Sequence, residues 1–91
     1  MTVKIRNADM NVIRTSRNLR GILDHARRVP VRQVNVADHI DGGALISVYY
    51  DNGDSCTTEF ASRSVCEGWV KARRSWGLVA RDVTGGVTRY M

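Results

Sequence analysis

The sequence predicts an α+β fold: a three- to four-stranded antiparallel sheet with two helices packed on one face, in the order (β)-α-β-β-β-α. Three observations predict this class. Residues 16–28 carry an apolar stripe at helical spacing, Asp51-Asn52-Gly53 reads as a hairpin turn, and an amphipathic stretch ends before Gly77. With 91 residues, the chain is expected to form a single domain over residues 1–91.

The first two elements are a short strand and a helix. Val3 and Ile5 alternate with charged residues, which predicts a strand before a turn at residues 7–9. The apolar stripe of the helix consists of Leu19, Ile22, Leu23 and Ala26. Thr15 or Ser16 is a suitable N-cap, and Pro30 disfavours helical geometry at the residue before it, so we expect a helix over residues 16–28.

A half-buried strand follows the helix. Val34 and Val36 alternate with polar Gln33 and Asn35, and this pattern predicts one buried and one exposed side. The strand leads into a loop over residues 38–43, which ends in two glycines. This strand therefore joins the hairpin that comes next.

The hairpin at residues 44–60 has two candidate registers. A two-residue turn at Asn52-Gly53 would mix apolar and polar side chains on each face. If Gly53 instead takes the left-handed position of a three-residue bulged turn, Val48 lies opposite Cys56 and the faces separate. We prefer this register. The side chains that then face the helices are those of Ala44, Ile46, Val48, Cys56 and Phe60. The side chains on the opposite face are those of Leu45, Ser47, Tyr49, Ser55, Thr57 and Glu59.

The second helix begins at Ser62 or at Ser64, and it ends before Gly77, a natural left-handed terminator. Its expected apolar stripe is Val65, Trp69, Ala72 and Trp76, and we interpret both tryptophans as core rather than as a platform for stacking bases. Residues 78–83 and 87–90 flank two glycines. They form either an edge hairpin or a tail that is flexible over residues 84–91.

The chain is basic, with 14 Lys+Arg against 9 Asp+Glu and a net charge of +5. Arginine greatly outnumbers lysine, which favours contact with an acidic macromolecular partner. Both helices carry positive, negative, positive ladders at four-residue steps, Arg20, Asp24 and Arg28 in the first and Arg63, Glu67 and Lys71 in the second. Such ladders are typical of solvated helix faces.

The sequence contains no catalytic, metal-binding or cofactor-binding motif, so we expect neither an enzyme nor a cofactor. No pair among His25, His39, Cys56 and Cys66 has the spacing of a zinc site. The cysteines are expected to be small packed hydrophobes, and His39 is expected to be an exposed loop residue. Asp51 and Asp54 suit hydrogen bonding within the turn.

The chain shows no apolar leader and no long hydrophobic run, and it has only two cysteines. These features predict a reduced, cytoplasmic setting without membrane contact. If a phage encodes the protein, this setting is the host cytoplasm. No small-molecule substrate is expected.

The order of helix, three antiparallel strands and helix over residues 16–76, with His39 in the first inter-strand loop, resembles the double-stranded-RNA-binding domain. The Gly-Pro that precedes that family's histidine is missing here, and Ser62-Arg63-Ser64-Val65-Cys66-Glu67 lacks the family's lysines. The resemblance therefore implies topology alone. In size and arginine content the chain is also similar to small accessory proteins of phages and plasmids, including anti-CRISPR and other anti-defence inhibitors.

Two functional hypotheses from different classes follow. The first is a non-enzymatic protein-binding regulator or inhibitor of phage or mobile-element type, whose open sheet face binds a partner through Leu45, Tyr49, Thr57 and Arg32. A homodimer through that face is its simplest variant. The alternative is a nucleic-acid-binding module that uses arginines near the helix ends, Arg17, Arg27, Arg28, Arg73 and Arg74. We favour protein binding because acids offset much of the helices' charge and aromatic residues are few.

Overall fold

The computed structural model describes residues 2–39, 42–76 and 80–91. Its strands are β1 (Val3–Arg6), β2 (Val12–Ser16), β3 (Val31–Asp38), β4 (Ala44–Tyr50), β5 (Ser55–Phe60), β6 (Arg81–Asp82) and β7 (Arg89–Tyr90). Its α-helices are α1 (Arg20–Ala26) and α2 (Arg63–Lys71), and the short 3-10 turns are η1 (Arg74–Trp76) and η2 (Thr84–Gly86). No helix in these ranges is long and apolar enough to cross a membrane.

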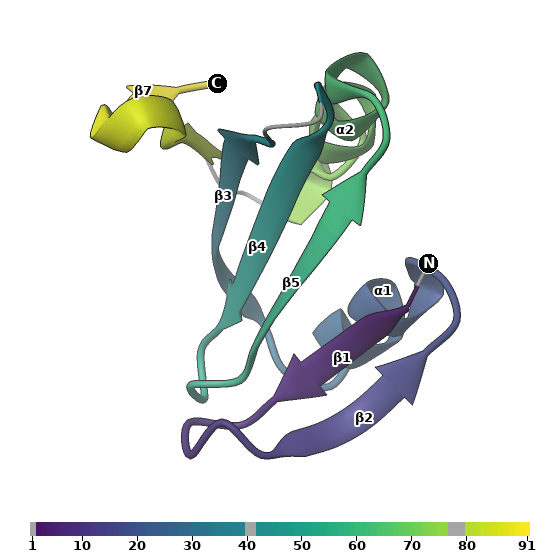
Figure 1. Ribbon diagram of the computed structural model, residues 1–91. Helices are drawn as coiled ribbons and strands as arrows, with labels where there is room; N and C mark the ends of the chain where they lie inside the picture. Colours follow the sequence, from purple (N-terminus) through teal and green to yellow (C-terminus); the bar gives the residue numbers. More distant parts are fainter. Residues whose placement is uncertain (1, 40–41, 77–79) are drawn as a thin grey trace.

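The predicted α+β class is confirmed (Figure 1). The strands form one mostly antiparallel mixed sheet in the order β2-β1-β5-β4-β3-β6-β7. The expected three- to four-stranded sheet is its centre, β1 with β3, β4 and β5. It is extended by β2 at one edge and by β6 and β7 at the other, where β6 runs parallel to β3.

The expected start of the first helix is wrong. Residues 12–16 form β2, which pairs with β1, and α1 begins at Arg20. Ser16 lies opposite Val3, and its hydroxyl donates to the carbonyl of Asn18. Ser16 is therefore the last residue of β2 and not the N-cap of a helix. Pairing with β1 overrides the local helical signal, as tertiary contacts commonly do. Ile22 of the predicted stripe is fully buried.

The preferred hairpin register is confirmed. Val48 lies opposite Cys56, and Gly53 has a φ of +92°, the left-handed conformation that the bulged turn requires. The backbone N–H of Tyr50 donates to the Asp54 carbonyl at 2.9 Å, and that of Gly53 donates to the Tyr50 carbonyl at 3.1 Å. The five side chains expected to face the helices are buried.

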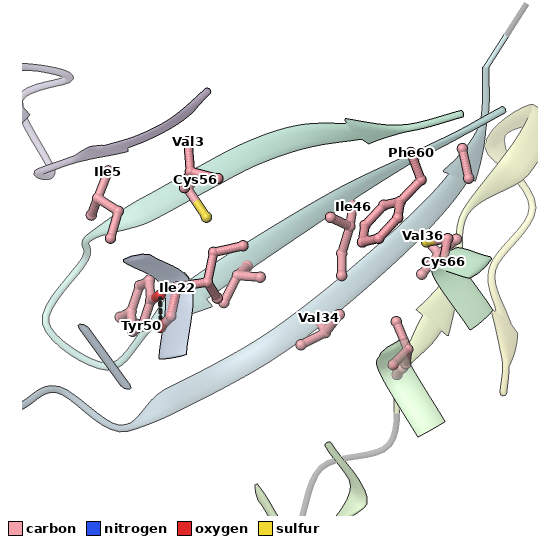
Figure 2. Packing of buried hydrophobic residues seen from close by; sticks show 14 residues of the cluster. Val3, Ile5, Ile22, Val34, Val36, Ile46, Tyr50, Cys56, Phe60 and Cys66 are labelled. Carbon is pink, nitrogen blue, oxygen red and sulfur yellow. Dashed lines mark hydrogen bonds between the residues drawn. The ribbon is translucent and has the colours of Figure 1, made fainter. Parts of the chain in front are cut away.

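The core lies between the sheet and the helices, which cover different parts of it (Figure 2). Ile22 of α1 packs beside Tyr50, whose hydroxyl donates to the Ile22 carbonyl at 2.9 Å. Cys66 of α2 lies beside Val36 toward the other end of the sheet. The opposite face of the sheet therefore carries neither α-helix.

Helix α2 differs from expectation in its stripe and its end. Ser62 is the N-cap, and its hydroxyl accepts from the Val65 backbone N–H at 3.5 Å. Val65 is 60% exposed and Ala72 is also exposed, whereas the buried residues of the helix are Cys66 and Val70. The helix ends at Lys71 and is followed by η1, while Gly77, the expected terminator, lies outside the described residues.

Both tryptophans pack against the core, as predicted. Trp69 and Trp76 are half-buried, and their ring centroids lie 6.0 Å apart at an interplanar angle of 83°. Trp69 also contacts the ring of Phe60, with a centroid distance of 6.2 Å. This edge-to-face stacking places the tryptophans beneath the sheet, on the side of the helices.

The C-terminal segment forms the edge hairpin that was one of the two expectations. Strand β6 pairs with β3, and β7 pairs with β6. The backbone N–H of Val83 donates to the Val36 carbonyl at 2.8 Å, and that of Met91 donates to the Ala80 carbonyl at 2.9 Å. Residues 78 and 79 of the expected strand lie outside the described residues.

Candidate functional site

The face of the sheet opposite the helices, here called the outer face, holds most of the residues assigned to a partner site. Leu45 and Tyr49 are half-buried on β4, and Thr57 is exposed on β5. Alternation along the paired strands places all three on one side. The outer face comprises Lys4, Arg6, Val12, Thr15, Gln33, Asn35, Ala37, Leu45, Ser47, Tyr49, Ser55, Thr57, Glu59, Arg81 and Tyr90.

One hollow of the outer face brings Tyr49 and Arg32 together. It has a volume of about 270 Å³, and its walls are Arg32, Gln33, Asn35, Tyr49 and Arg81. Arg81 reaches this place because β6 pairs in parallel with β3, opposite Asn35. The sequence could not predict this neighbour, because the expected C-terminal hairpin had no assigned position in the sheet.

A second hollow lies between β1 and β5. It has a volume of about 220 Å³ and is lined by residues that include Lys4, Arg6, Met10, Ser55 and Thr57. The Thr57 hydroxyl lies 3.1 Å from the hydroxyl of Ser47 on β4. Hydroxyl groups thus occupy the middle of the outer face, and cations stand on both sides of it.

The outer face carries more positive than negative charge. Lys4 and Arg6 stand at one side, and Arg81, with Arg32 beside it, stands at the other. Among the described strand residues that point outward, Glu59 is the one carboxylate. The geometry thus offers several charged hydrogen-bond donors to an acidic surface, with hydroxyl groups between them.

His39 is half-buried rather than exposed as expected. Its Nε2 lies 3.6 Å from Oε1 of Glu59, at the end of the outer face. His39 and Glu59 also line a hollow of about 660 Å³ along β5. The His39 backbone N–H donates to the Gly43 carbonyl at 3.1 Å, and a Cβ on Gly43 would meet the Phe60 carbonyl oxygen at 2.2 Å, so only glycine fits at position 43.

The arginines of the nucleic-acid alternative belong to different elements. Arg17, Arg27 and Arg28 flank α1, whereas Arg73 and Arg74 follow α2. Arg73 is half-buried, with its guanidinium 5.2 Å from the centroid of the Trp69 ring. Arg73 and Arg74 line a hollow beside Trp76, but the three arginines near α1 do not.

Arg63 ties three elements together, although the sequence linked it only to Glu67. Its Nε donates to Glu67 at 3.1 Å, and its two terminal nitrogens donate to Asp38 of β3 and to Asp82 of β6. These carboxylates, Asp82 first, raise the pKa of the Arg63 guanidinium. Thr84 donates to Asp82 and, with Arg63, lowers the pKa of that carboxyl to about 2 although burial opposes the shift.

A buried polar contact joins α1 to the hairpin turn. His25 Nε2 lies 2.8 Å from Asp54 Oδ2, and both side chains are 8% exposed. The ring of Tyr50 packs edge-on against His25 with centroids 4.7 Å apart, and burial raises the pKa of the Tyr50 hydroxyl. Asn52 also donates to Asp54, at 3.0 Å. The sequence predicted hydrogen bonding by Asp54 but not its partner on α1.

Both cysteines are buried in the core as free thiols, as expected for small packed hydrophobes. Burial raises the pKa of each thiol, Cys56 and Cys66, to about 11. Neither sulfur is therefore a thiolate near neutral pH. Within residues 2–39, 42–76 and 80–91 no group of three or more His, Cys, Asp or Glu side chains is arranged to hold a metal ion.

No family model matches the chain, and the searches of curated proteins and of solved structures also found no match.

Proposed function

We propose that the protein is a non-enzymatic binding module whose outer face binds an acidic surface of another protein. The observation that carries the proposal is the uncovered outer face, where hydroxyl groups lie between cations on both sides and Glu59 is the one opposing carboxylate of the described strands. Interfaces of this kind use tyrosine and arginine as anchors within a polar rim. Tyr49, between Arg32 and Arg81, is such an anchor.

The pattern of side chains favours a protein over a nucleic acid. Among the described strand residues of the outer face the aromatic ones are Tyr49 of β4 and Tyr90 of β7, and β3 and β6 separate these two strands. A sheet that binds single-stranded nucleic acid instead stacks successive bases on neighbouring aromatic rings. The arginines near the two helices do not supplement the outer face, because the helices lie on the other side of the sheet. A second copy of the chain is a poor partner, because two outer faces would oppose like charges.

A small basic module of this kind is suited to act as a regulator or inhibitor by covering an acidic surface of its target. Size and arginine content support a protein of phage or mobile-element type, such as an anti-defence or anti-CRISPR-like inhibitor. The acidic target would then be a component of the host cell. Inhibition by steric cover needs no catalytic group on this chain.

The test replaces two residues of the outer face, Tyr49→Ala with Thr57→Glu, so that an anchor is lost and a carboxylate opposes the acidic partner. We expect this double variant to lose its partner in a pull-down from host lysate while its thermal midpoint stays within a few degrees, because both side chains are at least partly exposed. A variant with Val65→Ala on the exposed side of α2 is the control and should keep the partner.

Nuclease treatment and salt separate the two classes of partner. A protein partner should remain bound after nuclease digestion. If all bound material disappears with nuclease, and if the affinity for duplex DNA falls with a log–log salt slope of about −0.9 for each phosphate neutralised, the nucleic-acid alternative replaces the proposal.

A further inference from the structure

One edge of strand β5 is paired along its whole length, whereas the other edge is paired only at one end. On one side it pairs with β4 over six consecutive positions, from Tyr49–Ser55 to Ala44–Phe60. On the other side β1 pairs with it only at Arg6 and Ser55. Figure 1 shows β1 and β5 diverging beyond this point, and the hollows of about 220 Å³ and 660 Å³ lie along β5 there.

The register shows which backbone groups face this opening. Hydrogen-bonded pairs alternate along an antiparallel hairpin, and the Tyr50 N–H donates to the Asp54 carbonyl. Counting from that pair, Cys56 and Thr58 exchange backbone hydrogen bonds with β4, so the N–H and C=O groups of Thr57 and Glu59 point away from it. Within the described part of the chain these groups have no backbone partner, and both residues are exposed.

The charges beside the opening determine which segment fits. Lys4 and Arg6 line its narrow end, where the described lining contains no carboxylate. No carboxylate of the described residues forms an ion pair with either of them. A segment that lies along β5 would therefore bring its own acidic side chains to Lys4 and Arg6.

We propose that an extended acidic segment of the partner protein adds to the free edge of β5 as a new strand, between β5 and the diverging β1. Backbone hydrogen bonds to Thr57 and Glu59 supply affinity in this mode, and alternate acidic side chains facing Lys4 and Arg6 supply specificity. This inference rests on the proposed function, because it defines how the outer face holds an acidic protein.

The experiment follows amide hydrogen exchange by NMR with a synthetic peptide as the probe. The probe is a capped eight-residue peptide of alternating Asp and Val, and its control has Lys in place of each Asp. In the free protein, we expect the amides of Thr57 and Glu59 to exchange faster than those of Cys56 and Thr58. At nine-tenths saturation with the acidic peptide, exchange at Thr57 and Glu59 should slow about tenfold, because only the unbound tenth exchanges.

A proline variant tests the backbone contact. Thr57→Pro removes an N–H that has no partner in the free protein, a position where a strand tolerates proline, so the fold should persist while peptide binding is lost. Thr57→Val is the matched control, because it loses the same hydroxyl but keeps the N–H, so the proline variant should bind the acidic peptide much more weakly than the valine variant does.

Three results would overturn strand addition: slow exchange at Thr57 and Glu59 in the free protein, no slowing by the acidic peptide at millimolar concentration, or equal binding by the proline and valine variants. Its failure is separable from failure of the proposed function. If partner capture from lysate is lost with Tyr49→Ala but kept with Thr57→Pro, the outer face binds without strand addition. If both variants keep the partner, the outer face is not the site.

Discussion

At the scale of single residues, one partly exposed group of ion pairs and one buried polar contact hold together segments far apart in the chain. Arg63 joins α2 to β3 and β6, and His25 joins α1 to the turn beside β5. The contact between His25 and Asp54 satisfies polar groups that burial would otherwise penalise. Both lie on the side of the sheet opposite the outer face, so they stabilise the sheet without covering its outer face.

The contact between His25 and Asp54 gives a prediction for stability. Asp54→Ala leaves the His25 imidazole buried without its partner, which should lower the free energy of unfolding by about 1–3 kcal/mol. Urea unfolding followed by circular dichroism measures the change. Asp51→Ala, at an exposed position of the same turn, is the control and should change stability by less than about 0.5 kcal/mol. Equal effects of the two substitutions would show that the buried contact contributes nothing.

Asp82 gives a prediction for pH dependence. Its pKa falls from 3.8 to about 2 in the folded protein, so the unfolded chain binds more protons between these values and stability decreases as pH falls through that window. Asp82→Asn should therefore be less stable than the parent chain above pH 4, and the difference should shrink toward pH 2. Urea unfolding at pH 7, 5, 4, 3 and 2 measures this.

The matched control for that titration is Glu59→Gln, since the Glu59 side chain is 69% exposed. Its stability should follow that of the parent chain closely at each pH. If the difference in free energy of unfolding between the parent chain and Asp82→Asn stays constant from pH 7 to pH 2, protonation of Asp82 does not control stability and the prediction is wrong.

At the scale of elements, local patterns predicted the central sheet well and the helix boundaries less well. The parity of the β4–β5 hairpin was predictable because one face of a strand must be apolar, and Gly53 fixed which face. Residues 12–16 were assigned partly to the first helix because Thr15 and Ser16 are good N-caps. Their pairing with β1 is a long-range choice that no local pattern shows.

The α2 stripe shows a second limit of local reasoning. The sequence offered two tryptophans and two small or apolar residues at helical spacing, yet Cys66 and Val70 occupy the core while Val65 is exposed. Rotation of a helix on a sheet depends on the shape of the surface beneath it, which a periodic pattern does not contain. For the same reason the contacts of Arg63 with Asp38 and Asp82 were not predictable from its ladder with Glu67.

At the scale of the whole molecule, the fold divides its charge between its two sides. Four acids of the inner side, Asp38, Asp54, Glu67 and Asp82, are held in contacts with Arg63 or His25. The cations of the outer face have few acidic neighbours. With Lys4, Arg6, Arg32 and Arg81 against Glu59, the outer face carries much of the net charge of +5, and this positive potential would guide an acidic partner toward it.

This arrangement also explains which residues of the site could be predicted from the sequence. Leu45, Tyr49 and Thr57 were placed on one face because their positions follow from hairpin parity. Arg81, Lys4 and Arg6 were not assigned to that face, because their places depend on where β6 and β1 join the sheet. The cations that make the outer face distinctive thus come from its edges, where topology decides the neighbours.

Site-specific photo-crosslinking tests the central claim most directly. Ser47, in the middle of the outer face, is replaced by benzoylphenylalanine in one variant, and Val65, exposed on α2, is replaced in another. The proposed function predicts a protein adduct from position 47 that survives nuclease treatment, and none from position 65. A nucleic-acid adduct at position 47, or a protein adduct from position 65 alone, would contradict it.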